Sequence, residues 1–244
     1  VGRNLKIRYK SSALGFFWSL LGPLLTILIY ALFARILRFS AGDPHYLEFL
    51  VVGLIVWQFL SLCLHDSLHA IMGNASLVKK TRFPRIVLPL STVAANLVNF
   101  LLTGVVLAAY LLIARARFSA LPWLPVVVLT QCALCLGLGL ILAAANVFFR
   151  DTEHILGTAT LAWFFLTPVF YAPDLQWSVL PSGWGWAIFL NPMTGIVCAY
   201  RRLLLSQPLL FAPGLALSAA VSWAALAVGV MVFQRCERRF GDEL

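Results

Sequence analysis

Residues 74–89 read Asn-Ala-Ser-Leu-Val-Lys-Lys-Thr-Arg-Phe-Pro-Arg-Ile-Val-Leu-Pro and separate two long apolar stretches of the chain. This short segment carries four cations, Lys79, Lys80, Arg82 and Arg85. Charged side chains are costly in hydrocarbon, and clusters of Lys and Arg gather on the cytoplasmic side of a membrane. The segment therefore predicts a point at which the chain leaves a membrane between two spanning helices.

The whole chain is too apolar for a water-soluble protein. Of its 244 residues, 61% are hydrophobic and only 11% are charged, and the mean hydropathy is +0.92. Soluble domains have about 45–50% apolar and about 25% charged residues. The apolar runs are continuous rather than alternating, which disfavours a transmembrane barrel. The composition predicts an all-α polytopic membrane protein formed by a single domain, residues 1–244.

Six apolar runs approach the ~20 residues that a helix needs to cross a bilayer. They cover residues 16–39, 46–72, 88–114, 121–149, 155–171 and 211–233. Between the last two runs, residues 173–206 are rich in Trp, Pro and Gly. This stretch is too broken for another spanning helix and too apolar for a free loop, and aromatic residues favour the membrane–water interface. We expect short helices there that lie in the interface or dip back into the membrane.

The cations are distributed unequally between the two sides that these runs define. Twelve of the 18 Lys and Arg residues fall on one side: Arg3, Lys6, Arg8, Lys10, Lys79, Lys80, Arg82, Arg85, Arg150, Arg235, Arg238 and Arg239. The other six are Arg35, Arg38, Arg115, Arg117, Arg201 and Arg202. By the positive-inside rule the richer side is cytoplasmic, so both termini and residues 74–89 are expected there. This topology and anionic headgroups explain the net charge of +9, and no nucleic-acid partner is expected.

The first basic cluster predicts a helix that lies flat on the inner membrane surface. Arg3, Lys6 and Lys10 recur at helical spacing, and Arg8 adds a fourth cation. Basic side chains on such a helix contact lipid headgroups. Such a helix is either a simple topological anchor, or it also contacts an anionic lipid substrate or a partner.

Residues 74–89 predict a short helix that ends at Phe83-Pro84, because a proline cannot continue a helix and restricts the residue before it. A rigid basic helix that projects into the cytoplasm can act as a lever, and the alternative is a plain basic loop. Arg150 and Asp151, at the inner end of the fourth run, offer either a second cytoplasmic contact or only a tight turn.

Two groups of side chains within the apolar runs have two interpretations each. His65, Asp66 and His69 place two His four residues apart on one helical face. They suit either a metal ion or hydrogen bonds between helices. On the fifth run, Trp163 and Phe170 are expected on one helical face, where aromatic rings could stack against sugars or serve ordinary packing.

Motifs for ATP binding and for several kinds of hydrolysis are absent from the sequence. It contains no G-x-x-x-x-G-K-[ST] phosphate loop, no H-E-x-x-H metal motif and no G-x-S-x-G nucleophile elbow. We therefore expect that the chain is no enzyme and that it holds no cofactor or metal of its own.

At these residues the chain resembles the membrane subunit of the ABC-2 type polysaccharide exporters, which move O-antigen, capsule or teichoic-acid chains. The matching stretches are residues 5–23, 74–89, 146–151, and 168–171 followed by 191–193 and 200–201. They extend in order over nearly the whole chain. One difference is Asn4, where the family often has Asp, so this chain lacks the acid at that position.

The resemblance implies a channel formed by two copies of the chain, with two separate ATPase subunits that bind ATP and Mg docked below. Residues 1–15 would form an interface helix, 74–89 the coupling helix seated in the ATPase, and 173–206 the outer gate helices. The residues implied in coupling are Asn74, Leu77, Lys79, Lys80, Arg82, Phe83, Pro84, Arg150 and Asp151. Those implied in the channel are Phe16, Tyr30, Phe33, Trp163, Phe170 and Tyr171. Those implied in the outer gate are Trp177, Trp184, Asn191, Pro192, Tyr200 and Arg201.

These observations predict the permease subunit of an ATP-driven exporter for a lipid-linked polysaccharide, O-antigen in particular, in the bacterial inner membrane. Six helices of one chain enclose no pore wide enough for a glycan, which also favours a homodimer. A first alternative is an exporter of the same architecture for a small drug or a lipid. A second is a membrane-embedded enzyme acting on lipid-linked sugars, with His65, Asp66 and His69 as its site.

Overall fold

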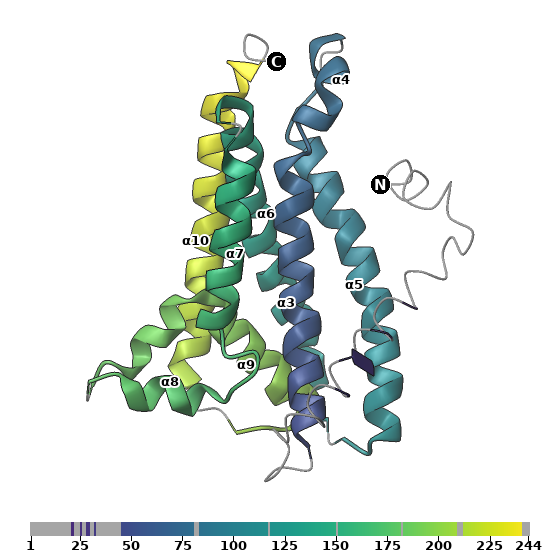
Figure 1. Cartoon of the computed structure of the whole chain (residues 1–244), viewed down its shortest axis with the longest axis vertical. Coiled ribbons are helices and arrows are strands. Elements are labelled where there is room, and N and C mark those ends of the chain that lie inside the picture. The colour runs from purple at the N-terminus through teal and green to yellow at the C-terminus, as the bar shows by residue number, and fades with distance from the viewer. Residues whose placement is uncertain are drawn as a thin grey trace.

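The computed structural model describes residues 21, 25, 28, 29, 32, 45–80, 83–116, 118–149, 151–181, 183–208 and 212–240, with only the backbone of Lys80. Every regular element within these residues is helical (Figure 1). In chain order the elements are α3 (Tyr46–Leu68), η1 (Met72–Asn74), α4 (Ala75–Lys80), α5 (Val87–Ile113), η2 (Leu121–Trp123), α6 (Leu124–Phe148), α7 (Thr152–Leu166), α8 (Pro173–Val179), η3 (Gly185–Leu190), α9 (Pro192–Leu205) and α10 (Ala212–Glu237).

Helices α3, α5, α6, α7 and α10 run along the long axis of the molecule (Figure 1). One end, called here the α4 end, holds α4, the start of α7 and the C-terminal ends of α6 and α10. The opposite end, called the α8 end, holds α8, α9, the start of α3 and the C-terminal end of α5. The described basic segments that the charge count assigned to one side therefore do lie together.

Four helices are long and apolar enough to cross a membrane. They are Tyr46–Leu68 with 23 residues, Val87–Ile113 with 27, Leu121–Phe148 with 28 and Ala212–Glu237 with 26. They correspond to the predicted runs 46–72, 88–114, 121–149 and 211–233. The prediction of an all-helical, multi-pass membrane protein is confirmed for the described part of the chain, whereas most of the predicted run 16–39 lies outside it.

The predicted run 155–171 is only partly helical. Its counterpart α7 has 15 residues, begins earlier than expected and ends at Leu166. Pro168 disfavours helical geometry at the preceding residue, and Thr167 is indeed extended, with φ −97° and ψ 135°. Fifteen residues rise about 22 Å, which is short of the ~30 Å of hydrocarbon in a bilayer. The count of six spans stays a prediction.

Helices α6 and α10 approach each other at a pair of glycines. A Cβ atom added to Gly229 would lie 2.2 Å from the carbonyl oxygen of Gly137. A Cβ atom added to Gly137 would lie 2.5 Å from the backbone of Ala225. Small residues of this kind allow spanning helices to bring their backbones into contact. The two glycines therefore set the closest point between α6 and α10.

Helix α3 lies at the centre of the fold, and polar side chains of α6 bond to it. The Gln131 amide donates to the carbonyl oxygen of Val56 at 2.8 Å, and the Asn146 amide donates to that of Leu68 at 3.0 Å. Both amides are buried. Hydrogen bonds across helices stabilise association where water is excluded, so these two bonds hold α6 against α3 at separate heights.

Candidate functional site

Some predicted site residues lie outside the described part of the chain: Arg3, Lys6, Arg8, Lys10, Phe16, Tyr30, Phe33, Arg82 and Arg150. Their roles, and the interface helix over residues 1–15, stay predictions. The remaining predicted residues fall into three regions, which are the α4 end, a cavity beside α7, and the α8 end.

The predicted short helix in residues 74–89 is present at the α4 end. The turn after α3 leads through η1 into α4, which has six residues, and the chain is no longer helical at Phe83 and Pro84. The Asn74 side chain donates to the carbonyl oxygen of Ala70 at 2.9 Å, so this residue braces the turn. Lys79 and Pro84 are exposed, whereas Leu77 and Phe83 are half-buried.

Helix α4 is attached to the body of the protein by Val78, which is 3% exposed and is the one buried side chain among those described for this helix. Val78 belongs to an apolar cluster with residues of α6, of α10 and of the segments that follow α3 and α10: Ile71, Leu140, Ala143, Ala144, Val147, Phe233 and Phe240. A force on α4 would therefore reach α6 and α10 by packing, besides reaching α3 and α5 along the chain. The sequence alone indicated only the second route.

Asp151 lies in the tight turn between α6 and α7. Helix α6 ends at Phe148 and α7 begins at Thr152, whose hydroxyl donates to the carbonyl oxygen of Phe149 at 2.5 Å. The Asp151 side chain is exposed at the α4 end, where a partner could reach it. The tight turn is thus present, and a second contact role stays a prediction.

His65, Asp66 and His69 do not converge on one point. Asp66 accepts a hydrogen bond of 2.9 Å from Asn96 of α5, and His65 lies 2.9 Å from the carbonyl oxygen of Ser61 in its own helix. His69 lies 3.7 Å from Glu153 of α7. Among the described residues, no three His, Cys, Asp or Glu side chains could hold a metal ion together. Asp66 hydrogen-bonds to a neighbouring helix, as one of the two interpretations predicts, whereas His65 bonds within its own helix and the His69–Glu153 contact is longer than a hydrogen bond.

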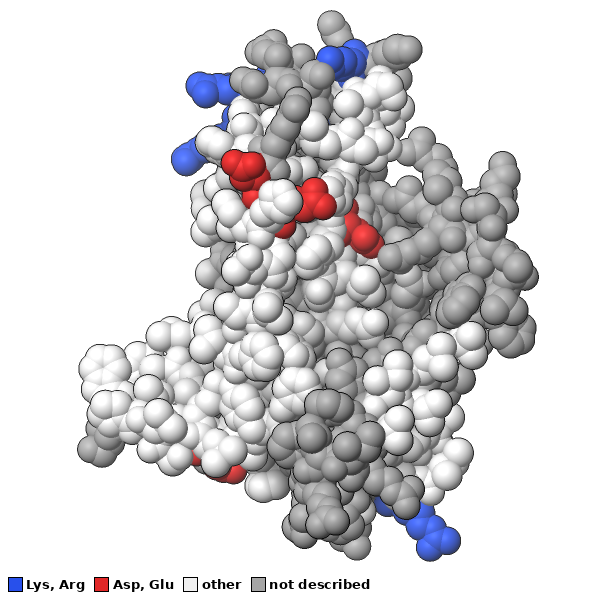
Figure 2. Space-filling view, in the orientation of Figure 1, with Lys and Arg blue, Asp and Glu red and all other residues white. Residues whose placement is uncertain are grey.

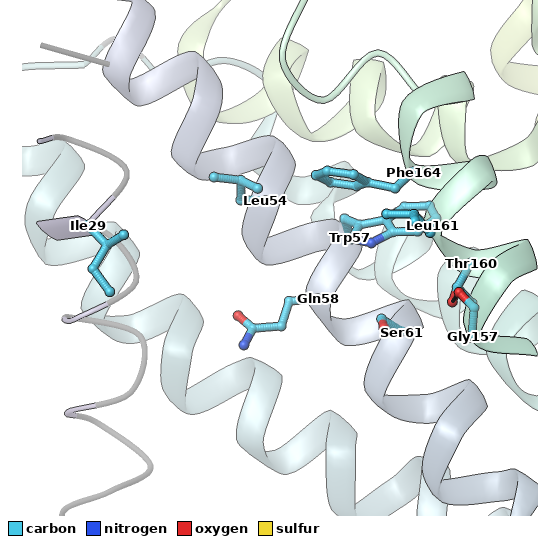
Figure 3. A pocket seen from close by; sticks show the side chains of 9 residues that line it. All are labelled: Ile29, Leu54, Trp57, Gln58, Ser61, Gly157, Thr160, Leu161 and Phe164. Carbon is cyan, nitrogen blue, oxygen red and sulfur yellow. Dashed lines mark hydrogen bonds between the residues drawn. The ribbon is translucent and has the colours of Figure 1, made fainter. Parts of the chain in front are cut away.

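A cavity of about 600 Å³ lies beside α3 and α7 (Figure 3). Its lining consists of Ile29, Leu54, Trp57, Gln58, Ser61, Gly157, Thr160, Leu161 and Phe164. In Figure 3 the Gln58 side chain extends toward Ile29, while Trp57, Leu161 and Phe164 gather on the side of α7. An aromatic wall with a few amide and hydroxyl groups is the chemistry that suits sugar rings. The lining residues of α3 were missed, although Gln58 and Ser61 are polar within an apolar run.

The aromatic rings around this cavity form a connected group. Trp57 of α3 contacts Trp163 at 5.8 Å and Phe164 at 5.3 Å between ring centroids, and Phe164 contacts Phe170 at 5.0 Å. The expectation that Trp163 and Phe170 share a helical face is wrong, because α7 ends between them at Leu166. Tyr171 follows in the same non-helical turn, and its hydroxyl donates to the carbonyl oxygen of Phe165 at 2.7 Å.

Asn191 joins the end of α7 to the start of α9. Its side-chain oxygen accepts from the Trp163 ring nitrogen at 2.8 Å and from the Met193 backbone at 3.1 Å. Its amide nitrogen donates to the Thr167 hydroxyl at 3.1 Å. Asn191 is thus the N-cap of α9, and Pro192 follows it in the first helical turn, where a missing N–H costs nothing.

Arg201 of α9 is 2% exposed, although the sequence predicts a gate residue. Its guanidinium donates to the carbonyl oxygens of Pro168 at 2.6 Å, Val169 at 2.7 Å and Phe49 at 3.2 Å. It also lies 3.2 Å from the centroid of the Phe49 ring, and Gly53 leaves space for it. Burial lowers the pKa of Arg201 to about 9, so the side chain remains cationic at neutral pH. Arg201 therefore fastens the non-helical turn after α7 to α3.

The other predicted gate residues differ in their exposure. Trp184 is exposed and stacks on Trp186 at 6.2 Å, and Trp177 packs over Gly185. Tyr200 is buried and contacts the ring of Phe100 at 6.0 Å. The expected short helices of residues 173–206 are present as α8, η3 and α9, but their role as a gate stays a prediction.

Comparison with known proteins identifies the family. A model of the ABC-2 type transporter family matches residues 1–205. The chain belongs to the ABC-2 type transporter family. It is 33% identical to the O-antigen export system permease protein RfbA of Klebsiella pneumoniae, over 99% of this chain and 92% of the relative. It is 36% identical to the protein of the same name from Myxococcus xanthus, over 100% of this chain and 93% of the relative.

Family membership has two consequences for the site. The relatives are named as permeases of an export system, so this ABC-2 protein is a transport component rather than an enzyme. An export system of this family also requires an ATPase component, which agrees with the missing phosphate loop in the sequence.

Proposed function

We propose that this chain is the permease subunit of an ATP-driven exporter that moves lipid-linked polysaccharide, O-antigen in particular, across the bacterial inner membrane. The observation that carries the proposal is its similarity to three O-antigen export permeases over at least 99% of this chain and 92% of each relative. The similarity is not confined to one segment, so it includes the α4 end, the cavity and the α8 end alike.

The partners follow from the same proposal. Two copies of the chain form the channel, and two ATPase subunits bind ATP and Mg and dock at the α4 end on the cytoplasmic side. Support comes from the basic residues of the α4 end, which the positive-inside rule assigns to the cytoplasm. Both termini are then cytoplasmic as well.

Closure of the ATPase on ATP would drive transport through α4. A ligand shifts a conformational equilibrium only as far as it binds one state better than the other, so the closed ATPase must hold α4 in a different position. Helix α4 is joined to α3 through η1 and precedes α5 in the chain, and Val78 would pass the displacement to the apolar cluster that includes residues of α6 and α10.

The cavity beside α3 and α7 is our candidate for part of the glycan path. Helix α7 also exposes an apolar face that includes Ile155, Leu161, Phe165 and Leu166. In a membrane protein such a face contacts either lipid or another helix. In the homodimer, the second copy would cover this face and close the cavity into a channel.

Substitution of Phe83 tests the coupling role of residues 74–89, called here the α4 segment. We expect the Phe83→Asp permease, reconstituted with its ATPase, to export several-fold less O-antigen for each ATP hydrolysed. The reason is that a carboxylate in place of a half-buried ring would weaken the seating of α4 in the ATPase. The measurement is simultaneous ATP hydrolysis and glycan transfer into vesicles.

Phe83→Leu is the matched control, because it keeps an apolar side chain at the same half-buried position. Its export per ATP should equal that of the wild type. An unchanged ratio for Phe83→Asp would contradict the coupling role. A wild-type complex that hydrolyses ATP but moves no O-antigen would contradict the proposed substrate, and would favour a drug or lipid exporter.

A further inference from the structure

The C-terminal end of α10 is fastened to the junction between α4 and α5. The backbone N–H of Arg85 donates to Glu237 Oε1 at 3.2 Å, and the Arg85 guanidinium donates to the carbonyl oxygen of Glu237. The same guanidinium lies 5.9 Å from the centroid of the Phe240 ring. Arg85 lies between α4 and α5 in the chain. It thus binds residues that are about 150 positions away in the sequence.

Phe240 fixes this end of the chain to the body of the protein. Its side chain is 0% exposed and lies 5.4 Å from the Phe233 ring and 6.0 Å from the Phe148 ring, between centroids. It belongs to the same apolar cluster as Val78 of α4. The residues around Phe240 therefore have a defined position beside α4.

A basic surface results from this arrangement. Lys79 of α4 and Arg235, Arg238 and Arg239 at the end of α10 are all exposed. Figure 2 shows Lys and Arg at the tip of the α4 end of the visible face, with Asp and Glu in a band next to them, and further Lys or Arg at the opposite end. Within the described residues, Glu237 is the acidic side chain next to these arginines in sequence, and it already bonds to Arg85. We call Lys79, Arg235, Arg238 and Arg239 the basic docking surface.

We propose that the basic docking surface binds an acidic face of the ATPase partner, so that the end of α10 is a docking element beside α4. This inference rests on the proposed function, because that function requires an ATPase at the α4 end. Anchoring to lipid headgroups depends on the number of cations and not on their fixed position. Here buried Phe240 and the bonds of Arg85 hold the cations in a fixed position beside α4. Recognition of a folded partner requires such a fixed arrangement of charges.

Neutralising the two outermost cations tests the proposal. We expect the Arg238→Gln/Arg239→Gln permease in nanodiscs to bind the purified ATPase subunit of its own export system about fivefold more weakly at low salt. The difference should shrink as the salt concentration rises, because salt screens exposed charges. Arg235 is left unchanged, since a cation in the last turn also stabilises its own helix.

Arg115→Gln is the matched control, because Arg115 is an exposed cation at the α8 end. Its affinity for the ATPase should equal that of the wild type. Equal affinity of the Arg238→Gln/Arg239→Gln variant and the wild type at low salt would overturn the proposal. So would a loss that appears only in nanodiscs with anionic lipid and not in neutral ones, because headgroups would then explain the cations. A wild-type permease that binds no ATPase would instead overturn the proposed function.

The fixed position of the surface has its own test. Phe240→Ala leaves all four cations in place but removes the ring that anchors them, so we expect weaker ATPase binding here too. If Phe240→Ala lowers the yield of folded protein, Phe240→Leu keeps an apolar anchor and should bind better than the alanine variant. Wild-type affinity for Phe240→Ala would overturn the requirement that α10 holds the surface in place.

Discussion

At the scale of single residues, Arg201 shows how this protein tolerates irregular backbone in its interior. Pro168 and Val169 follow the end of α7, and their carbonyl oxygens have no helical turn to complete. Such groups must be satisfied inside the protein when no water is available. Arg201 supplies the donors, and its aromatic neighbour Phe49 shields the charge. The residue thus has a structural function that its sequence position does not reveal.

Replacing Arg201 by alanine is predicted to destabilise the fold. The Arg201→Ala change leaves buried carbonyl oxygens without donors, and each such group costs about 1–3 kcal/mol. We expect the free energy of unfolding in detergent to fall by about 3 kcal/mol or more. Arg202→Ala is the control, because Arg202 is exposed and, among the described residues, its side chain donates to the carbonyl oxygen of Gln207. A similar loss for both variants would contradict the role of Arg201.

The space beside Arg201 offers a second test of the same contact. A Cβ atom at Gly53 would lie 2.6 Å from the Arg201 guanidinium, so Gly53→Ala should also be destabilising. The two effects should not add, because Arg201→Ala removes the group with which the new methyl collides. Additive losses of stability in the double variant would show that Gly53 and Arg201 act separately.

At the scale of elements, the contact between α6 and α10 depends on the absence of side chains. Gly229→Ala is predicted to push the two helices apart, because its methyl group would meet the Gly137 carbonyl, a backbone atom that cannot rotate away. Overpacking of this kind costs about 1–3 kcal/mol. The measurement is the melting temperature of the purified protein and its ATP-dependent export.

Gly104→Ala is the control for this prediction, because nothing lies within 4 Å of a Cβ atom at that position of α5. Alanine is favoured over glycine in a helix by up to about 1 kcal/mol, so Gly104→Ala should be neutral or slightly stabilising. Equal effects of the Gly104 and Gly229 substitutions would mean that helix propensity, and not the close contact, governs both sites.

Several elements could be predicted from the sequence because their cause is local. The spanning helices follow from continuous apolar runs, and the end of the short helix in residues 74–89 follows from Phe83-Pro84. The early end of α7 also has a local cause in Pro168, and its position could have been predicted more closely from that residue. The pairing of Gly137 with Gly229 could not, because these glycines are distant in sequence and meet only through packing.

At the scale of the whole molecule, the candidate site was predicted in part. The grouping of the basic segments at one end follows from the alternation of spans, which needs no knowledge of packing. The cavity lining on α3 and the link from Arg85 to Glu237 were missed, because both depend on which helices become neighbours. An apolar run in the sequence indicates how deep a residue lies in the membrane. It does not indicate which neighbouring helix that residue contacts.

The positions of the two ends on opposite sides of the membrane can be tested by labelling. In a variant without native cysteines, a membrane-impermeant maleimide should modify Arg115→Cys in intact spheroplasts. It should modify Lys79→Cys only after permeabilisation, because the α4 end is proposed to face the cytoplasm. Both positions are exposed, so accessibility within the protein is matched. Labelling of Lys79→Cys in intact cells would contradict the assigned topology.

The glycine contact between α6 and α10 would be the fulcrum if these two helices tilt against each other during transport. It lies near the middle of α6, but on α10 it lies closer to the α4 end than to the α8 end. Two rods in tight contact tilt about that contact, so their ends on one side separate as those on the other approach. In that case a displacement applied to the part of α10 near the α4 end would arrive reversed and enlarged at its other end. The energy of ATP could therefore be used near the cytoplasm and still open the opposite face of the membrane.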